Sequence, residues 1–410
     1  MAEGQAGMLT AEELFGDSLV DDPYPSYRRF LDAGPVHYVN YKRGTWAIFS
    51  HAACSTAIRD MRLTAKRTAM FLLTLPPEQC LEFAELARLL GLWMLFIDAP
   101  EHTRLRKLMN RGFSPAVVES LHPQVEAIVD GMLDPLLHAS EADLMQAIAY
   151  PLPMHVIAEM LGIPHTMYDR LLEWTDAIAR FFGVPNQQTV ETLRPAQNAV
   201  LELTQFFREA VAERRNQKGN DLISLLLDIE EDGDVLTQEE VHAQCVMLLF
   251  GGHETTRNLV GNGMYTLLQH PEEIAELREN PALIRSAVEE LLRYESPVQY
   301  TARMAKVELE ICGVRLRPGE PILFMLGAAN RDAAQFGEPD RLDLKRVSNP
   351  HLAFGAGAHF CIGNQLARLE GQVAILKLVQ RFPRMRFAQQ RAEWIPNLVL
   401  RGLKALPVVL

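Results

Sequence analysis

A capping box opens the longest helical pattern in the sequence. Thr237 is followed three residues later by Glu240, a pairing in which each side chain satisfies a backbone N–H of the other at a helix N-terminus. Beyond it, apolar and small residues recur in steps of three and four as far as Leu268, so they share one helix face. At 1.5 Å per residue this helix is about 45 Å long, enough to cross a domain. The residues of that face are Val241, Cys245, Leu248, Leu249, Gly252, Thr256, Leu259, Val260 and Met264.

The remaining sequence predicts a mainly α-helical fold with small β-sheets, in a single domain that spans residues 1–410. Residues 115–295 are helical in pattern almost throughout, and a second long helix is expected at 364–382. A turn is expected at 42–44, between the first two strands. Short strands are expected at 36–39, 46–49, 307–311, 314–316 and 321–324.

Composition excludes several classes of protein. The chain is 48% hydrophobic and 22% charged, which is typical of a folded globular protein. A net charge of −12 argues against a general nucleic-acid surface, which needs clustered Lys and Arg. The apolar run 89–97 is too short to cross a bilayer, and the N-terminus does not resemble a signal peptide. Five scattered cysteines without CxxC spacing argue against a disulfide framework. We therefore expect a cytoplasmic monomer that binds neither membrane nor nucleic acid.

Cys361 differs from the other cysteines in its surroundings. It ends the segment Phe354-Gly-Ala-Gly-Ala-His-Phe-Cys361 and lies just before the second long helix. Taken alone, a cysteine is most often a small buried hydrophobe. Here the glycines allow a tight turn and a close backbone approach to a flat ligand. The N–H groups and dipole of a helix N-terminus stabilise a thiolate. Such a thiolate is a good axial ligand for a metal.

This segment resembles the haem-binding loop of cytochromes P450, Phe-x-x-Gly-x-x-x-Cys-x-Gly. Phe354, Gly357, Cys361 and Gly363 fill every fixed position, and His359 stands where the family most often carries arginine. The resemblance implies a cytochrome P450 fold, with haem b between the long central helix and the helix after the cysteine. It also implies that Cys361 ligates the iron and that Phe354 contacts the cofactor.

A Glu-x-x-Arg pair also matches the family. Glu290 and Arg293 lie three residues apart on a predicted helix. By itself, a pair at this spacing is usually an exposed ion pair on the helix surface. The segment that ends at Arg341 resembles the stretch that supplies a second arginine to this pair. The resemblance implies a buried Glu290–Arg293–Arg341 brace for the haem loop, with a structural role.

The middle of the long helix carries adjacent glycines followed by His253, Glu254 and Thr255. A threonine can bond back to the carbonyl four residues earlier and distort a helix locally. By resemblance, Gly252 would contact the cofactor, Thr255 would assist oxygen activation and Glu254 would relay protons from solvent. An ordinary solvated helix face is the alternative for Glu254 and Thr255. A His-Glu-x-x-His zinc site is excluded, because its fifth position is Arg257.

Basic residues are candidates for contacts to the haem propionates. His102 and Arg106 are four apart on a predicted helix, so they share a face, and arginine pairs well with carboxylates. The resemblance places His102 and Arg106 on one propionate, and Arg303 and His359 at the other. It also implies a basic surface for an acidic iron–sulfur protein. The candidates for that surface are Arg104, Lys107, Arg111 and Arg368.

The resemblance, which covers the chain from Asp22 to Pro407, implies a monooxygenase that inserts one oxygen atom of dioxygen into its substrate. Electrons would come from a separate ferredoxin and ferredoxin reductase. The pocket residues are largely apolar and favour a hydrophobic substrate such as a natural-product intermediate. Oxidative coupling, desaturation and peroxide-driven oxidation remain alternatives, as does a non-catalytic haem sensor. The expected pocket residues are Met70, Leu89, Leu90, Phe181, Met247, Gly251, Val298, Tyr300 and Leu398.

Overall fold

The computed structural model describes residues 8–40, 44–72, 75–183, 189–231, 234–388 and 392–410. Most of the expected turn at 42–44 lies outside these ranges. Contacts within the chain divide it into two compact units. The sheet unit comprises Met1–Ala65, Asn258–Cys361 and Ile375–Leu410, and the helical unit comprises Lys66–Arg257 and Ile362–Ala374. The expectation of one domain stays a prediction.

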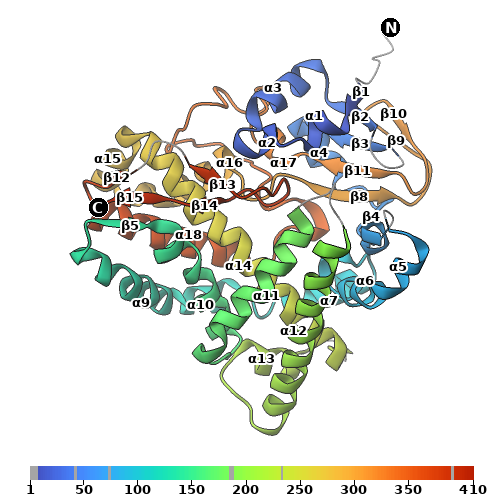
Figure 1. Cartoon of the computed structure of the whole chain (residues 1–410), viewed down its shortest axis with the longest axis horizontal. Helices are drawn as coiled ribbons and strands as arrows, with labels where there is room; N and C mark the ends of the chain where they lie inside the picture. The colour runs from blue at the N-terminus through green and yellow to red at the C-terminus, as the bar shows by residue number, and fades with distance from the viewer. Residues whose placement is uncertain (1–7, 41–43, 73–74, 184–188, 232–233, 389–391) are drawn as a thin grey trace. The chain divides into compact units, whose positions relative to one another are not determined.

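A six-stranded mixed sheet is the main β-structure of the sheet unit (Figure 1). Its strand order is β1-β2-β3-β11-β8-β4. β1 pairs with β2 and β3 pairs with β11 in parallel, and the other neighbours are antiparallel. The six strands are β1 Met8–Thr10, β2 Val36–Asn40, β3 Thr45–Ile48, β4 Leu63–Thr64, β8 Thr301–Ala305 and β11 Pro321–Phe324.

Both faces of this sheet are buried. Ala47 of β3 and Leu323 of β11 face one apolar cluster, and Ile48, Ile322 and Phe324 face another. The alternation follows from the two-residue period of a strand. The first cluster contains Phe30 of α3, and the second contains Cys54 of α4. α17 contacts both of these helices.

Helices and small strands complete the sheet unit. Its helices are α1 Ala11–Phe15, α2 Ser18–Asp21, α3 Tyr24–Ala33, α4 His51–Ala57, α15 Pro271–Glu279, α16 Ile284–Tyr294 and α17 Leu326–Ala329, with short helices η6 Pro281–Leu283 and η7 Gly357–His359. Its smaller sheets use β9 Leu309–Ile311, β10 Val314–Leu316, β12 Arg386–Phe387, β13 Glu393–Trp394, β14 Leu403–Ala405 and β15 Pro407–Val409. The predicted strands at 314–316 and 321–324 match β10 and β11 in both bounds, and the strand expected from 307 begins at Leu309.

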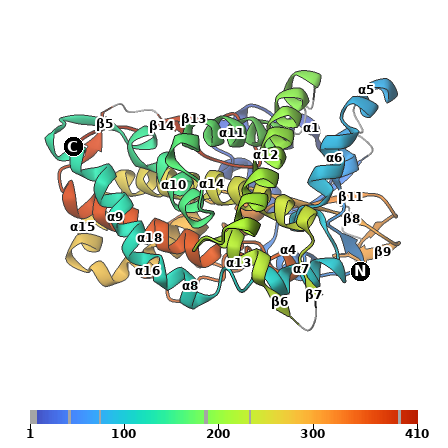
Figure 2. The same ribbon diagram turned by 90° about the horizontal axis from the view of Figure 1, so that it is seen from below.

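The helical unit is a set of packed helices with few strands. α11 packs along α12, and α10 contacts α11 and α9 (Figure 2). Its longer helices are α5 Pro77–Glu82, α6 Ala84–Gly91, α7 Glu101–Met109, α8 Pro115–Ser120, α9 His122–Leu133, α10 Pro151–Met160, α11 Tyr168–Gly183, α12 Val190–Asn216 and α13 Leu222–Asp228. Its short elements are η1 Thr68–Leu72, η2 Met94–Phe96, η3 Asp134–His138, η4 Met145–Ala149, η5 His165–Met167, β5 Glu141–Asp143, β6 Glu230–Glu231 and β7 Asp234–Val235.

The two predicted long helices are confirmed. α14 spans Gln238–Gln269 and α18 spans Asn364–Arg381, and the division between the units falls within each of them. The capping box also forms: the backbone N–H of Thr237 donates to Glu240 at 2.8 Å, and that of Glu240 donates to Thr237 at 3.2 Å. Across the described residues, no helix is long and apolar enough to cross a membrane.

The carboxylate of Glu290 on α16 lies fully buried in the sheet unit. Arg293, one turn later, donates to it from Nε and Nη2 at 2.8 and 2.7 Å. Arg346 Nε lies 3.0 and 3.2 Å from the two oxygens, and Asn349 Nδ2 donates at 3.1 Å. A buried charge is tolerated only when it is paired and hydrogen-bonded. This network ties α16 to the segment that leads into the cysteine loop.

The prediction that Arg341 supplies the second arginine is wrong. The Arg341 side chain is largely exposed and bonds Glu338, while Arg346 holds Glu290. Arg341 contributes only its backbone carbonyl, which accepts from Arg293 at 3.3 Å. The loop around residues 337–346 folds back so that Arg346 points inward, a geometry that chain spacing does not determine.

We predict that Arg346→Ala lowers the free energy of unfolding by about 3 kcal/mol, because it leaves part of the buried Glu290 charge uncompensated. Arg341→Ala removes the same chemistry from an exposed site and should change it by less than about 0.5 kcal/mol. Urea denaturation followed by circular dichroism measures both. Equal losses for the two variants would contradict the assignment of Arg346.

Candidate active site

The backbone of the cysteine loop depends on two glycines with positive φ. Gly355 and Gly357 have φ of 70° and 71°, a region that other residues enter at a cost of about 1–2 kcal/mol. A Cβ added to Gly357 would lie 3.0 Å from Cγ of Arg59. The positive φ therefore favours glycine at position 357, and a Cβ there would also require the Arg59 side chain to shift.

Cys361 closes this loop. Its backbone N–H donates to the carbonyl of Phe354 at 3.0 Å, and its side chain is only half-buried. Ile362 and Gly363 separate it from Asn364, the first residue of α18. Cys54 and Cys245 are different, because full burial raises the pKa of each thiol and favours its neutral form. Cys361 therefore has the exposure and helix-terminal position that suit a thiolate ligand.

The loop fits haem by the chemistry of its donor and the shape of its backbone. A single thiolate suits a metal whose other ligands come from a macrocycle. Gly355 and Gly357, on either side of Ala356, leave the backbone without a side chain at two positions of the loop. The Phe354 ring is half-buried and packs against Phe360, with ring centroids 6.2 Å apart.

The middle of α14 presents an open surface at Gly251. A Cβ added there would have nothing within 4 Å among the described residues, whereas one at Gly252 would lie 3.5 Å from Ile157. The open position is at Gly251 and not at its neighbour, since consecutive helical residues point about 100° apart, and the expected cofactor contact of Gly252 stays a prediction. Thr255 Oγ1 donates to the Gly251 carbonyl at 2.8 Å. The predicted threonine back-bond is confirmed.

Glu254 is buried, so the alternative of a solvated face is wrong for this residue. Its Oε1 lies 3.3 Å from Nη1 of Arg257. Burial raises the pKa of Glu254, and the Arg257 charge offsets part of this rise. Neighbouring His253 contacts Thr175 at 3.1 Å and the Tyr150 carbonyl at 3.0 Å. Burial lowers the pKa of His253 to about 4, so this ring is neutral at neutral pH.

The four candidate propionate contacts divide between the units. His102 and Arg106 share a face of α7 in the helical unit, where His102 is buried and Arg106 donates to Asn110 at 2.9 Å. Arg303 on β8 and His359 in η7 belong to the sheet unit. Arg303 is buried, and its Nη1 donates to the carbonyl of Ala302 at 2.8 Å.

The basic residues that we expected to bind an acidic iron–sulfur protein differ in their surroundings. Arg104 bonds Asp234 at 3.3 Å and also pairs with Glu240 of the capping box. Its charge is therefore largely neutralised inside the helical unit, against our expectation of an available surface cation. Lys107 and Arg111 are exposed.

Aromatic side chains gather where we expected one wall of the substrate pocket. Phe71 packs against Phe181 with ring centroids 5.0 Å apart, and Phe182 packs against Phe250 at 5.3 Å. Met247, one turn before Phe250 on α14, is buried. The full set of rings is Phe71, Trp93, Phe96, Phe181, Phe182 and Phe250.

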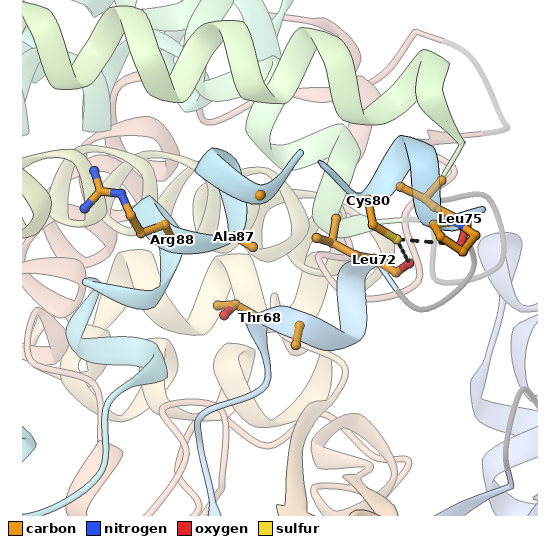
Figure 3. Close-up of a pocket in the computed structure, with 9 residues that line it drawn as sticks. Thr68, Leu72, Leu75, Cys80, Ala87 and Arg88 are labelled. Carbon is orange, nitrogen blue, oxygen red and sulfur yellow. Dashed lines mark hydrogen bonds between the residues drawn. The ribbon is translucent and has the colours of Figure 1, made fainter. Parts of the chain in front are cut away.

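An open cavity of about 700 Å³ adjoins this region of the helical unit (Figure 3). η1, α5 and α6 form it, on either side of the predicted Met70 and just before the predicted Leu89 and Leu90. Leu89 instead lines a smaller cavity of about 190 Å³, and Leu90 is fully buried. The larger cavity is lined by Thr68, Ala69, Leu72, Leu75, Pro77, Cys80, Ala84, Ala87 and Arg88.

The pocket candidates of the sheet unit lie against its apolar clusters. Tyr300 is buried in the cluster on the α3 side of the sheet, with its ring centroid 6.3 Å from that of Phe15. Leu398 packs against the same cluster and Val298 against the other, both half-buried. Tyr300 thus contributes to the core of this unit.

Sequence reasoning missed three residues of these networks. Arg346 had no distinguishing pattern. Arg257 was seen only as the residue that excludes a zinc site, although its spacing from Glu254 is that of a helical ion pair. Asp176 on α11, whose Oδ1 lies 3.9 Å from Arg257 Nη1, carries no motif at all.

Comparison with known proteins agrees with this geometry. The sequence model of the Cytochrome P450 family matches residues 90–397. Cytochrome P450 monooxygenase PikC of Streptomyces venezuelae is 40% identical over 402 residues, 96% of this chain and 92% of PikC. A biotin biosynthesis cytochrome P450 of Bacillus subtilis (strain 168) is 36% identical over 402 residues, 98% of this chain and 99% of that protein.

Solved structures give the same answer. The structure of P450BioI in complex with hexadec-9Z-enoic acid ligated acyl carrier protein superposes with a TM-score of 0.89 and 35% identity. The match covers 96% of this chain and 99% of that one. The family binds haem b through its cysteine loop. This chain belongs to the cytochrome P450 family and is an enzyme of the P450 monooxygenase class.

Proposed function

We propose that Cys361 is the axial thiolate of a haem b monooxygenase that oxidises a hydrophobic small molecule. The observation that carries the proposal is the position of this half-buried thiol, in a loop with two positive-φ glycines, three residues before the start of α18. The family membership of the chain supports the same role.

The bound haem supplies the chemistry of dioxygen activation, and the protein supplies binding, orientation and protons. His102, Arg106, Arg303 and His359 would hold its two propionates by charge-assisted hydrogen bonds. Gly251 leaves open space beside α14, and the hydroxyl of Thr255 lies one turn further along that helix. Burial raises the pKa of Glu254, so this carboxyl keeps a proton to higher pH than an exposed glutamate does.

The substrate proposal rests on the cavity formed by η1, α5 and α6. Its volume of about 700 Å³ lies in the range that encloses a drug-sized molecule. Its walls are largely aliphatic, and Arg88 at its edge is already paired with Glu85 and Glu239. An anionic group of a ligand would gain little binding energy from this paired arginine. We therefore propose that the cavity receives an apolar part of the substrate.

Electrons would come from a ferredoxin and its reductase. The exposed side chains of Lys107 and Arg111 support an acidic partner in this region. The pairing of Arg104 with Asp234 and Glu240 makes it a weaker candidate than it was on sequence alone.

We predict that Cys361→Ala abolishes the thiolate-type Soret band in the difference spectrum of the reduced protein with carbon monoxide. Cys80→Ala, which changes another half-buried cysteine, should keep the band. Haem content is measured in parallel. If haem-containing Cys361→Ala protein keeps the band, Cys361 is not the iron ligand.

We predict that Ala87→Trp weakens the binding of bulky apolar ligands about tenfold, because the indole fills part of the cavity. Leu81→Trp places the same ring on the exposed face of α5 and should leave affinity unchanged. Titration of the low-to-high spin shift with a panel of ligands gives the dissociation constants. If both variants bind like the parent protein, the cavity does not receive substrate.

A further inference from the structure

Two carboxyl groups meet between α11 and α14 in the helical unit. The carboxyl groups of Asp176 and Glu254 both lie beside the guanidinium of Arg257, and each acid shifts the pKa of the other. The Tyr150 hydroxyl donates to Oδ2 of Asp176 at 3.0 Å. Arg257 Nη1 lies 3.3 Å from Glu254 Oε1 and 3.9 Å from Asp176 Oδ1. The four groups form one connected cluster.

The charges of this cluster favour a single shared proton. Two carboxylates in contact repel each other strongly when both are ionised, so such pairs retain one proton. With one proton on the pair, a single negative charge remains, and the guanidinium of Arg257 balances it. The centroid of the Tyr150 ring lies 4.8 Å from the guanidinium carbon of Arg257. This cation–π contact holds the arginine in place.

The two acids differ in exposure to solvent. This difference sets the direction in which a proton would move between them. The Asp176 side chain is 32% exposed, and that of Glu254 is 5% exposed. Asp176 therefore exchanges protons with solvent, whereas Glu254 lies inside and directly precedes Thr255. Arg257 is itself about nine-tenths buried, and its Nε donates to no residue of the described chain. That N–H can hold an ordered water within the cluster.

We propose that Asp176 and Glu254 share one proton and form the solvent entrance of the proton route to the active site. Glu254 delivers the shared proton toward the active site, and Asp176 then takes one replacement proton from solvent water. Arg257 and Tyr150 position the pair. The inference deepens the proposed function, because the delivered protons are those that dioxygen reduction consumes.

The direction of the pH dependence follows from the groups that face the pair. Burial is the main cause that raises the pKa of both Asp176 and Glu254. Arg257 and the exposed Arg180 lower the pKa of Glu254, and His253 is neutral at neutral pH. Burial also raises the pKa of Tyr150, so its hydroxyl remains a donor. The shared proton persists to higher pH than on an exposed carboxyl and is lost as pH rises.

Infrared spectroscopy of the haem-loaded resting enzyme tests the shared proton without turnover. The parent protein should show the C=O stretch of a protonated carboxyl at neutral pH, and the band should fade as pH rises. Asp176→Asn and Glu254→Gln should each remove or shift it. Asp169→Asn, the same substitution at an exposed position of α11, should leave it intact. If neither Asp176→Asn nor Glu254→Gln changes the band, the proposal that the two acids share a proton is wrong.

Turnover tests the route. Asp176→Asn should slow product formation by at least about tenfold, raise the solvent deuterium isotope effect and alter the alkaline limb of the pH profile. Asp176→Glu should restore most of the rate, and Asp169→Asn should behave like the parent. Asp176→Asn with parental rate, isotope effect and pH profile would overturn the role. Because the infrared result does not depend on Cys361, failure of the proposed ligation and failure of this inference are distinguishable.

Discussion

The buried carboxylate of Glu290 is the interaction on which the arrangement of the cysteine loop depends. A fully buried charge cannot stay without partners, so the chain around it has to supply N–H donors from several segments. Arg293 comes from the same helix, while Arg346, Asn349 and the backbone N–H of Asp343 come from the segment before the loop. Satisfying one charge thereby fixes the path of that segment.

A second set of hydrogen bonds extends this network to the loop itself. Arg293 Nη1 donates to the carbonyl of Asn330 at 2.9 Å, and the Asn330 side chain accepts from the N–H of Leu352 at 2.7 Å. Leu352 stands two residues before Phe354, whose carbonyl in turn accepts from the N–H of Cys361. The thiol is therefore positioned through a continuous series of contacts that begins at a buried ion pair. The proposed metal ligand is thus held by hydrogen bonds and not by loop stiffness alone.

Local pattern was sufficient for elements whose determinants are close in sequence. The capping box of Thr237 and Glu240 located the start of α14, and the turn residues around β10 and β11 located both strands. Local sequence pattern was not sufficient where the structure depends on the direction in which a side chain of an irregular segment points. Arg341 and Arg346 lie in the same loop, and only the folded path of that loop decides which one reaches Glu290. Asp176 could not be found for a related reason, because its partner Glu254 is far away in the chain.

Two buried glutamates on helices show how surroundings give the same side chain different uses. Glu290 receives N–H donors on both oxygens from two arginines, an asparagine and the backbone, so its negative charge is held firmly in place. Glu254 has one guanidinium at 3.3 Å, which it shares with the Asp176 carboxyl, and burial raises its pKa. A carboxylate that accepts hydrogen bonds on both oxygens from several segments stabilises the structure. Glu254 has fewer donors, and the raised pKa that burial gives it is the property that the proposed proton carrier requires.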